Sequence, residues 1–189
     1  MIAGGVSQGV FNGWISLLDN IIQPLGFSDY QVSWLGFSCN LAALFGGIIV
    51  AKANDLLQRR LKLIILLLYG VATVCFIWFT LCALKVIPGP YWMVLLSASL
   101  ASAALNASCP ILFEISVEIT YPTPEAVTGA LLTMVMNLGT IAFMVADIFT
   151  ISVTVINWLF CGTTVASFVF FIFMPVKYRR SDVDEHKQD

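Results

Sequence analysis

The chain of 189 residues is strongly apolar: 59% of its residues are hydrophobic and 11% are charged, against roughly 25% charged in an ordinary soluble domain. This composition excludes a soluble globular protein and predicts a protein of the lipid bilayer. The net charge of −2 comes without an extended basic run, so we expect no nucleic-acid partner.

Apolar windows of about 20 residues, long enough to cross the ~30 Å hydrocarbon core of a bilayer, can be placed six times. We therefore predict an all-α membrane domain over 1–175 and a polar cytosolic tail at 176–189. The first window is too long and too rich in glycine for a cleaved signal peptide. The six windows lie near 1–18, 32–53, 63–84, 91–114, 126–146 and 153–174.

Positive charges are concentrated on one side of the predicted membrane domain. The basic residues between the second and third windows and those after the sixth window make up all but Lys85. The positive-inside rule then predicts that both termini lie in the cytosol. The residues on the positive side are Lys52, Arg59, Arg60, Lys62, Lys177, Arg179, Arg180 and Lys187.

Uncharged amides are the polar residues that reach the middle of the predicted membrane: Gln8, Asn12, Asn40 and Asn137. Amides in hydrocarbon need hydrogen-bond partners from a neighbouring helix, water or a ligand. Either these side chains join helices to one another, or they line a polar solute site to which Trp14 adds an aromatic face.

The first window is a weak helix, because "GGVSQGVFNGW" at 4–14 carries four glycines beside polar side chains. Interrupted helices of this kind form midplane sites in transporters. The alternative is that the glycines allow neighbouring helices to pack closely.

Two glutamates lie at and beyond the end of the fourth window, in "CPILFEISVEITYPTPEAVTG" at 109–129. Glu114 lies about 35 Å of untilted helix from the start of the window at Tyr91, which places it at the cytosolic boundary. Glu118 lies a further turn out, and Pro122 and Pro124 predict a short turn into the fifth window.

Catalysis and cofactor binding are not expected. No histidine falls in a predicted span, and no group of histidine, cysteine and carboxylate residues has the spacing of a metal site. The five cysteines all lie within the apolar windows, where they are typical of packing residues.

The loop "AKANDLLQRRLK" at 51–62 resembles the signature between the second and third helices of each half of a major facilitator superfamily transporter. The matching residues are Ala51, where glycine is usual, then Asp55, Arg59 and Arg60. The stretch "FEISVEITYPTPE" at 113–125 resembles solute carrier family 49, the feline leukaemia virus subgroup C receptor-related group, from its tenth to its eleventh helix.

This resemblance covers residues 4 to about 180 and implies the carboxy-terminal half, helices 7–12, of a twelve-helix fold built as 3+3 inverted repeats. It implies alternating-access transport of a small polar or cationic organic solute, such as haem, a choline-like amine or a vitamin-like compound, in the lysosomal or plasma membrane. The partner would be the missing amino-terminal half or another copy. Family members tend to have a tyrosine at the position of Asn12, from which this chain departs, and can have an amide at the position of Asn137, which this chain matches.

The resemblance also implies a cytosolic gate. In related members a glutamate at the position of Glu118 pairs with an arginine of the loop motif, here Arg59 or Arg60, and Asp55 and Glu114 are candidates for the same network. The alternative function is a truncated, non-transporting membrane isoform that associates with a full-length transporter and regulates it.

Overall fold

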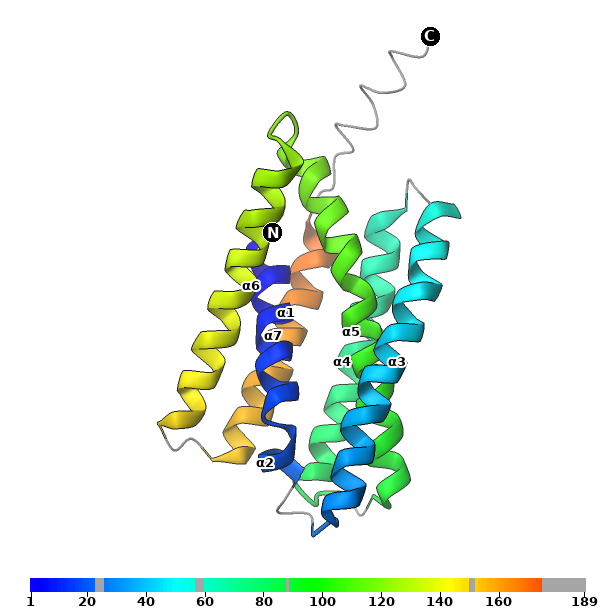
Figure 1. Ribbon diagram of the computed structural model, residues 1–189, viewed down its shortest axis with the longest axis vertical. Coiled ribbons are helices and arrows are strands. Elements are labelled where there is room, and N and C mark those ends of the chain that lie inside the picture. The colour runs from blue at the N-terminus through cyan, green and yellow to red at the C-terminus, as the bar shows by residue number, and fades with distance from the viewer. Residues whose placement is uncertain (23–25, 57–59, 88, 150–151, 175–189) are drawn as a thin grey trace.

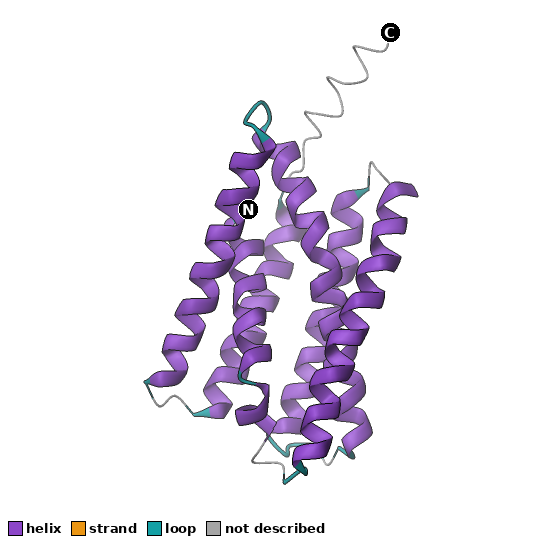
Figure 2. Ribbon diagram, viewed as in Figure 1, coloured by secondary structure: helices purple, strands orange, loops and turns teal. Residues whose placement is uncertain are grey.

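A computed structural model describes residues 1–22, 26–56, 60–87, 89–149 and 152–174, with the side chains of 53–56 and 153 left undescribed (Figure 1). Within these ranges the chain is made of helices and connecting loops, without strands (Figure 2). The helices are α1 (Ile2–Ser16), α2 (Leu18–Ile22), α3 (Asp29–Leu56), α4 (Leu61–Ala83), α5 (Tyr91–Thr120), α6 (Glu125–Ile148) and α7 (Val153–Phe173).

Five helices of the described chain, α3 to α7, are long and apolar enough to cross a membrane. They correspond to the second to sixth predicted windows. The first window, 1–18, corresponds to α1, whose 15 residues are fewer than the ~20 that cross a bilayer, and the short helix α2 follows after Leu17. The fourth window ends later than predicted, because α5 continues to Thr120. Glu114 and Glu118 are therefore helical residues.

Local sequence signals set the helix starts. At α3, the Ser28 N–H donates to Gln31 Oε1 at 3.1 Å and the Gln31 N–H donates to Ser28 Oγ at 3.4 Å, which is the reciprocal pattern of a capping box. The helices α5 and α6 each begin directly after an extended proline, Pro90 and Pro124. The capping box thus provides acceptors for the backbone N–H groups of Ser28 and Gln31, which have no partner within the helix.

The six longest helices of the described chain form two repeats of three, α1–α3–α4 and α5–α6–α7, with similar packing in each. Helix α1 packs along α6 as α5 packs along α3, α7 packs on α1 as α4 packs on α5, and the pairs α4 with α7 and α1 with α5 lie at the centre. Figure 1 shows that α1 and α5 run in opposite directions. Exchanging α1 with α5, α3 with α6 and α4 with α7 reproduces the packing pattern, as expected for a 3+3 inverted repeat.

The closest contact between helices joins α1 and α6. A Cβ built at Gly9 would overlap the carbonyl oxygen of Met136, and one at Gly139 would lie 3.0 Å from the carbonyl oxygen of Val6. The hydroxyl of Thr140 donates to the carbonyl oxygen of Gly9 at 2.9 Å. The glycines at this crossing therefore serve close packing, as in other membrane helix pairs.

Lys62 connects the beginning of α4 to the end of α7. Its Nζ donates to the carbonyl oxygens of Ile172 at 3.1 Å and Met174 at 2.7 Å. The last carbonyl groups of a helix have no partner within the helix and carry partial negative charge, so a lysine there both satisfies and stabilises them.

Replacing Lys62 with methionine should lower the free energy of unfolding by about 1–3 kcal/mol, because charge-assisted hydrogen bonds to two carbonyl groups are lost while the aliphatic stem is kept. Thermal unfolding in detergent measures the change. Lys52, exposed near the end of α3, supplies the control, and an equal loss in Lys52→Met would contradict the capping role.

Candidate functional site

Four helices carry an asparagine on their accessible surface, well inside the helix. Asn12 of α1, Asn40 of α3 and Asn137 of α6 are exposed, and Asn106 of α5 is partly exposed. Asn40 Nδ2 donates to the carbonyl oxygen of Gly36 at 2.8 Å, and Asn106 Nδ2 donates to that of Ser102 at 3.0 Å. Within the described chain, the amides of Asn12 and Asn137 form no hydrogen bond.

Over residues 126–138 the exposed surface of α6 is divided lengthwise into two flanks, and beyond Asn137 the surface becomes apolar, with Ile141 58% exposed. Successive residues are about 100° apart around a helix, so each flank collects residues three and four apart. One flank is small and polar, and we call it the polar flank of α6: Ala126, Ala130, Thr133 and Asn137. The other is the apolar flank of α6: Val127, Leu131, Met134 and Leu138.

Helix α3 shows the same division. Its polar flank consists of Ser33, Gly36, Asn40, Ala43 and Gly47. Its apolar flank consists of Trp34, Leu41, Phe45 and Ile49. A Cβ at Gly36 or Gly47 would meet no atom within 4 Å, so this polar flank is open. Since the fold exchanges α3 with α6, Asn40 and Asn137 lie on equivalent surfaces.

Asn106 brings α5 to the polar flank of α3. A shallow groove of about 470 Å³ is lined by Asn106 together with Ala43, Leu44, Gly47, Ile48 and Ala51 of α3. Figure 1 shows α6, α1, α5 and α3 across the molecule, with α7 behind α1. The four asparagines thus belong to the four helices that make up this layer.

Gln8 and Trp14 do not join the exposed amides. Gln8 is 3% exposed and its Oε1 has no hydrogen-bond partner among the described residues. Trp14 is fully buried, and its Nε1 donates to Asn157 Oδ1 at 3.2 Å. Its indole packs against Phe76, Phe79 and Phe160, with ring centroids 5.1–5.2 Å away. In this conformation the indole presents no open face to a solute.

Two asparagines of the structure, Asn106 and Asn157, are not among the predicted site residues. Asn106 lies in a run of small residues well inside the fourth window, and this position was the available signal. Asn157 is 1% exposed and its Nδ2 lacks a partner within the described residues. Its position inside the apolar run "TVINWLF" at 154–160 could have indicated a buried amide that needs a hydrogen-bond partner.

The predicted gate residues are placed only in part. Glu118 is 8% exposed near the end of α5, Glu114 is exposed one turn earlier, and Arg60 is exposed immediately before α4. The end of α5 and the start of α4 lie at the same end of the bundle in Figure 1. Arg59 and the side chain of Asp55 lie outside the described residues, so their pairing with Glu118 stays a prediction.

Comparison with known proteins covers the whole chain. The family model of the Major Facilitator Superfamily matches residues 1–189. The chain is 29% identical to "Solute carrier family 49 member 4 homolog" of Xenopus laevis over 188 residues, 97% of its own length. It is 28% identical to the protein of the same name from Xenopus tropicalis, again over 97% of its length.

The chain spans 41% of the length of both relatives, in keeping with the half of a transporter implied by its sequence. The inverted-repeat packing of its helices and the match over its full length lead to one conclusion: this chain belongs to the Major Facilitator Superfamily.

Proposed function

We propose that this chain forms one half of a transporter that carries a small polar or cationic organic solute by alternating access, the solute being of the haem, choline-like amine or vitamin-like class. The second half is an amino-terminal six-helix unit or another copy of the chain. Membership of the superfamily and similarity to solute carrier family 49 support membrane transport. The exposed amides support a particular location of the solute path, along the surface that they share.

The observation that carries this proposal is the division of α3 and α6 into polar and apolar flanks. Apolar side chains such as Leu138 and Phe45 suit contact with lipid. An amide in hydrocarbon without a partner is costly, so Asn40 and Asn137 require water, protein or solute on their side of the helix. The polar flanks therefore fit a water-accessible path between two halves.

Asn12, Asn40 and Asn137, together with Asn106, form one wall of the proposed path. Carboxamides both donate and accept hydrogen bonds, so they suit neutral and cationic polar groups alike. Gln8 and Trp14 contribute to this wall only through a rearrangement of α1, whose helix is interrupted at Leu17. Uptake by variants of these residues in the complete transporter tests the assignment.

The proposed gate uses Glu118 with Arg59, Arg60 and Asp55, and Glu114 at its edge. The burial of Glu118 supports this, because a carboxylate that is 8% exposed needs a charged or hydrogen-bonding partner. Such a pair stabilises the conformation that is closed on the cytosolic side and biases the equilibrium between the two access states. In the proposed orientation the gate faces the cytosol and both chain termini lie on the same side. The membrane is the lysosomal or the plasma membrane.

Replacing Glu118 with glutamine should shift the equilibrium toward the inward-open state by about tenfold, since an almost buried charge pair is lost. Cytosolic accessibility of a cysteine placed at Asn106 reports the shift. Glu125, exposed in the first turn of α6, supplies a control. An unchanged accessibility in Glu118→Gln, or the same change in Glu125→Gln, would remove Glu118 from the gate.

The open glycines of α3 also suit a second function, in which the chain associates with a full-length transporter and regulates it. Gly36 and Gly47 allow close approach of another helix. Expressing the chain beside a full-length relative separates the two functions. Changed uptake by the relative supports regulation, and uptake that appears only when a matching half is added supports transport.

A further inference from the structure

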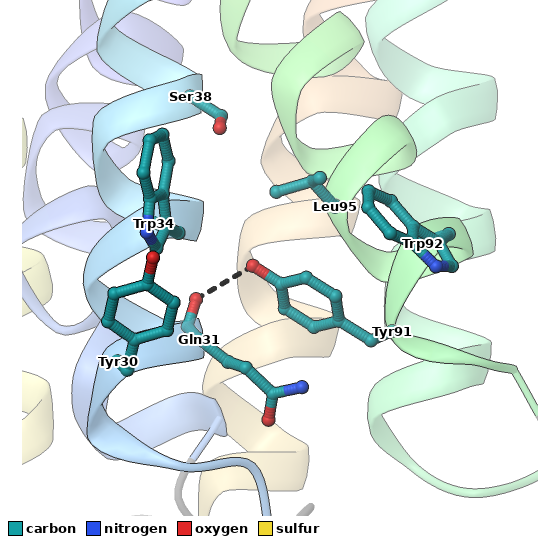
Figure 3. A pocket seen from close by; sticks show the side chains of 7 residues that line it. All are labelled: Tyr30, Gln31, Trp34, Ser38, Tyr91, Trp92 and Leu95. Atoms are coloured by element: carbon teal, nitrogen blue, oxygen red, sulfur yellow. Dashed lines mark hydrogen bonds between the residues drawn. The ribbon is translucent and has the colours of Figure 1, made fainter.

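A groove of about 420 Å³ lies between the beginnings of α3 and α5 (Figure 3). At 100° per residue, its lining residues Trp34 and Ser38 lie on the side of α3 away from Asn40. Its volume falls within the range of small-ligand sites, roughly 300–1,000 Å³. Because Trp34 belongs to the apolar flank of α3, the groove lies outside the proposed solute path. Its lining residues are Tyr30, Gln31, Trp34, Ser38, Tyr91, Trp92 and Leu95.

The aromatic walls of the groove are held in place by contacts within and between the helices. The Tyr91 hydroxyl donates to the carbonyl oxygen of Gln31 at 2.9 Å, which ties α5 to α3 (Figure 3). Trp34 packs edge-on against Tyr30 at 6.1 Å and against Phe37 at 5.5 Å between ring centroids. Isolated interfacial aromatic residues anchor a helix without enclosing a space. Here Tyr30, Trp34, Tyr91 and Trp92 line one open groove.

The lining presents no ionised side chain to a ligand. None of its seven residues is ionised at neutral pH, whereas a phosphate-bearing lipid head is recognised by lysine or arginine. Besides the Tyr30 hydroxyl and the indole N–H groups of Trp34 and Trp92, polar groups lie at the two ends of the groove. Gln31 Oε1 accepts from the Ser28 N–H at 3.1 Å, which leaves the Gln31 Nε2 group as a donor at the mouth. Ser38 lies two turns deeper, about 10 Å along the helix.

The depth of the groove matches a lipid with a small polar end and a rigid apolar body. Gln31 lies in the first turn of a spanning helix and so at the membrane surface. From there the groove runs inward past Trp34 and Leu95, and the apolar flank of α3 continues below it with Leu41 and Phe45. A rigid, flat ring system loses less conformational entropy than a flexible acyl chain when it lies against the aromatic walls, and its hydroxyl group meets the donor at the mouth.

We propose that this groove binds a sterol-class lipid of the bilayer. The sterol hydroxyl oxygen accepts a hydrogen bond from Gln31 Nε2, and the ring system lies against Trp34 of α3 and Leu95 of α5. The site is independent of the proposed solute path and does not depend on the chain being a transporter.

Photolabelling of the full chain tests the site. The chain is reconstituted in phosphatidylcholine vesicles with a diazirine-bearing cholesterol analogue, and labelled peptides are identified by mass spectrometry. We expect adducts within residues 29–38 or 91–96 that are removed by an excess of unlabelled cholesterol. Leu95→Trp fills the groove and should reduce labelling by about tenfold, the effect of overpacking a ligand site.

Two further variants make the test specific. Leu96 is 60% exposed on α5 and is not among the lining residues, so Leu96→Trp should label like the unmodified chain. Gln31→Glu keeps the acceptor for the Ser28 N–H and removes the Nε2 donor, so its labelling should fall while the fold is retained.

Several results would overturn the sterol site: no adduct in these two segments, adducts that cholesterol does not displace, or equal losses in Leu95→Trp and Leu96→Trp. Displacement by a soluble phosphocholine compound in place of cholesterol would assign the groove to a choline head group. If Leu95→Trp does not fold, as judged by size-exclusion chromatography, competition on the unmodified chain and labelling of Gln31→Glu decide the question.

Discussion

Replacing Asn137 with leucine should lower the kcat/KM of solute uptake about 10- to 100-fold, when the substitution is made in a complete transporter that contains this segment. The physical reason is the loss of a hydrogen bond to a polar or charged solute group in a site of low dielectric constant, where one such bond contributes about 1.5–3 kcal/mol. Asn137 is exposed and its amide is unused within the described chain, so the substitution leaves the packing of α6 intact.

The neighbouring residue gives a matched control. Leu138 is 55% exposed on the apolar flank of the same helix, and Leu138→Ile should leave uptake unchanged. Asn137→Gln should restore part of the activity, because the amide is kept on a longer side chain. Unchanged uptake in Asn137→Leu would remove this residue from the path, and an equal loss in Leu138→Ile would show that α6 is sensitive to any substitution.

Replacing Gly9 with alanine should destabilise the protein by about 3 kcal/mol or more. The new Cβ would overlap the carbonyl oxygen of Met136, a backbone atom that cannot rotate away, so α1 and α6 must separate. This separation also breaks the hydrogen bond from Thr140 to the Gly9 carbonyl group. Thermal unfolding in detergent and the yield of monodisperse protein measure the effect.

Gly162 of α7 provides the opposite case. A Cβ there would meet no atom within 4 Å, so Gly162→Ala should be neutral or stabilising by about 0.5–1 kcal/mol through helix propensity. Equal stability of Gly9→Ala and Gly162→Ala would contradict the close crossing of α1 and α6.

The membrane helices could be predicted from the sequence because their physical requirement is simple. A segment that crosses hydrocarbon must be apolar over about 20 residues, and α3 to α7 meet that requirement. Prolines and small polar residues mark their ends, as Pro124 does for α6. The end of α1 at Ser16 lies close to the predicted end of the first window at residue 18, whereas the short helix α2 that follows was not predicted.

The rotation of each helix about its axis could not be predicted. Counting residues gives the depth of a side chain but not the direction in which it points. In a soluble helix the apolar stripe fixes that direction, whereas a membrane helix is apolar toward both lipid and protein. Asn12 and Trp14 are only two residues apart in α1, and the structure places the first on the surface and the second in the core.

The candidate site differs from the sequence prediction in which residues share the exposed surface. The predicted set is divided into the exposed amides Asn12, Asn40 and Asn137 and two buried residues, Gln8 and Trp14. Asn106 joins the exposed amides through the groove that it shares with α3. The charge pattern of the 51–62 loop indicated the family, although Arg59 and the side chain of Asp55 lie outside the described residues.

The most direct test of the central claim is the reactivity of cysteines on the two flanks of α6. In a complete transporter containing this segment, with the five native cysteines of the segment replaced, a charged water-soluble thiol reagent should modify Asn137→Cys at least about tenfold faster than Leu138→Cys. The reason is that a thiol in contact with lipid does not ionise and meets no reagent. Slowing of the first reaction by transported solute would support the proposed path. Equal rates at the two positions would contradict the division into a polar, water-accessible flank and an apolar flank in the bilayer.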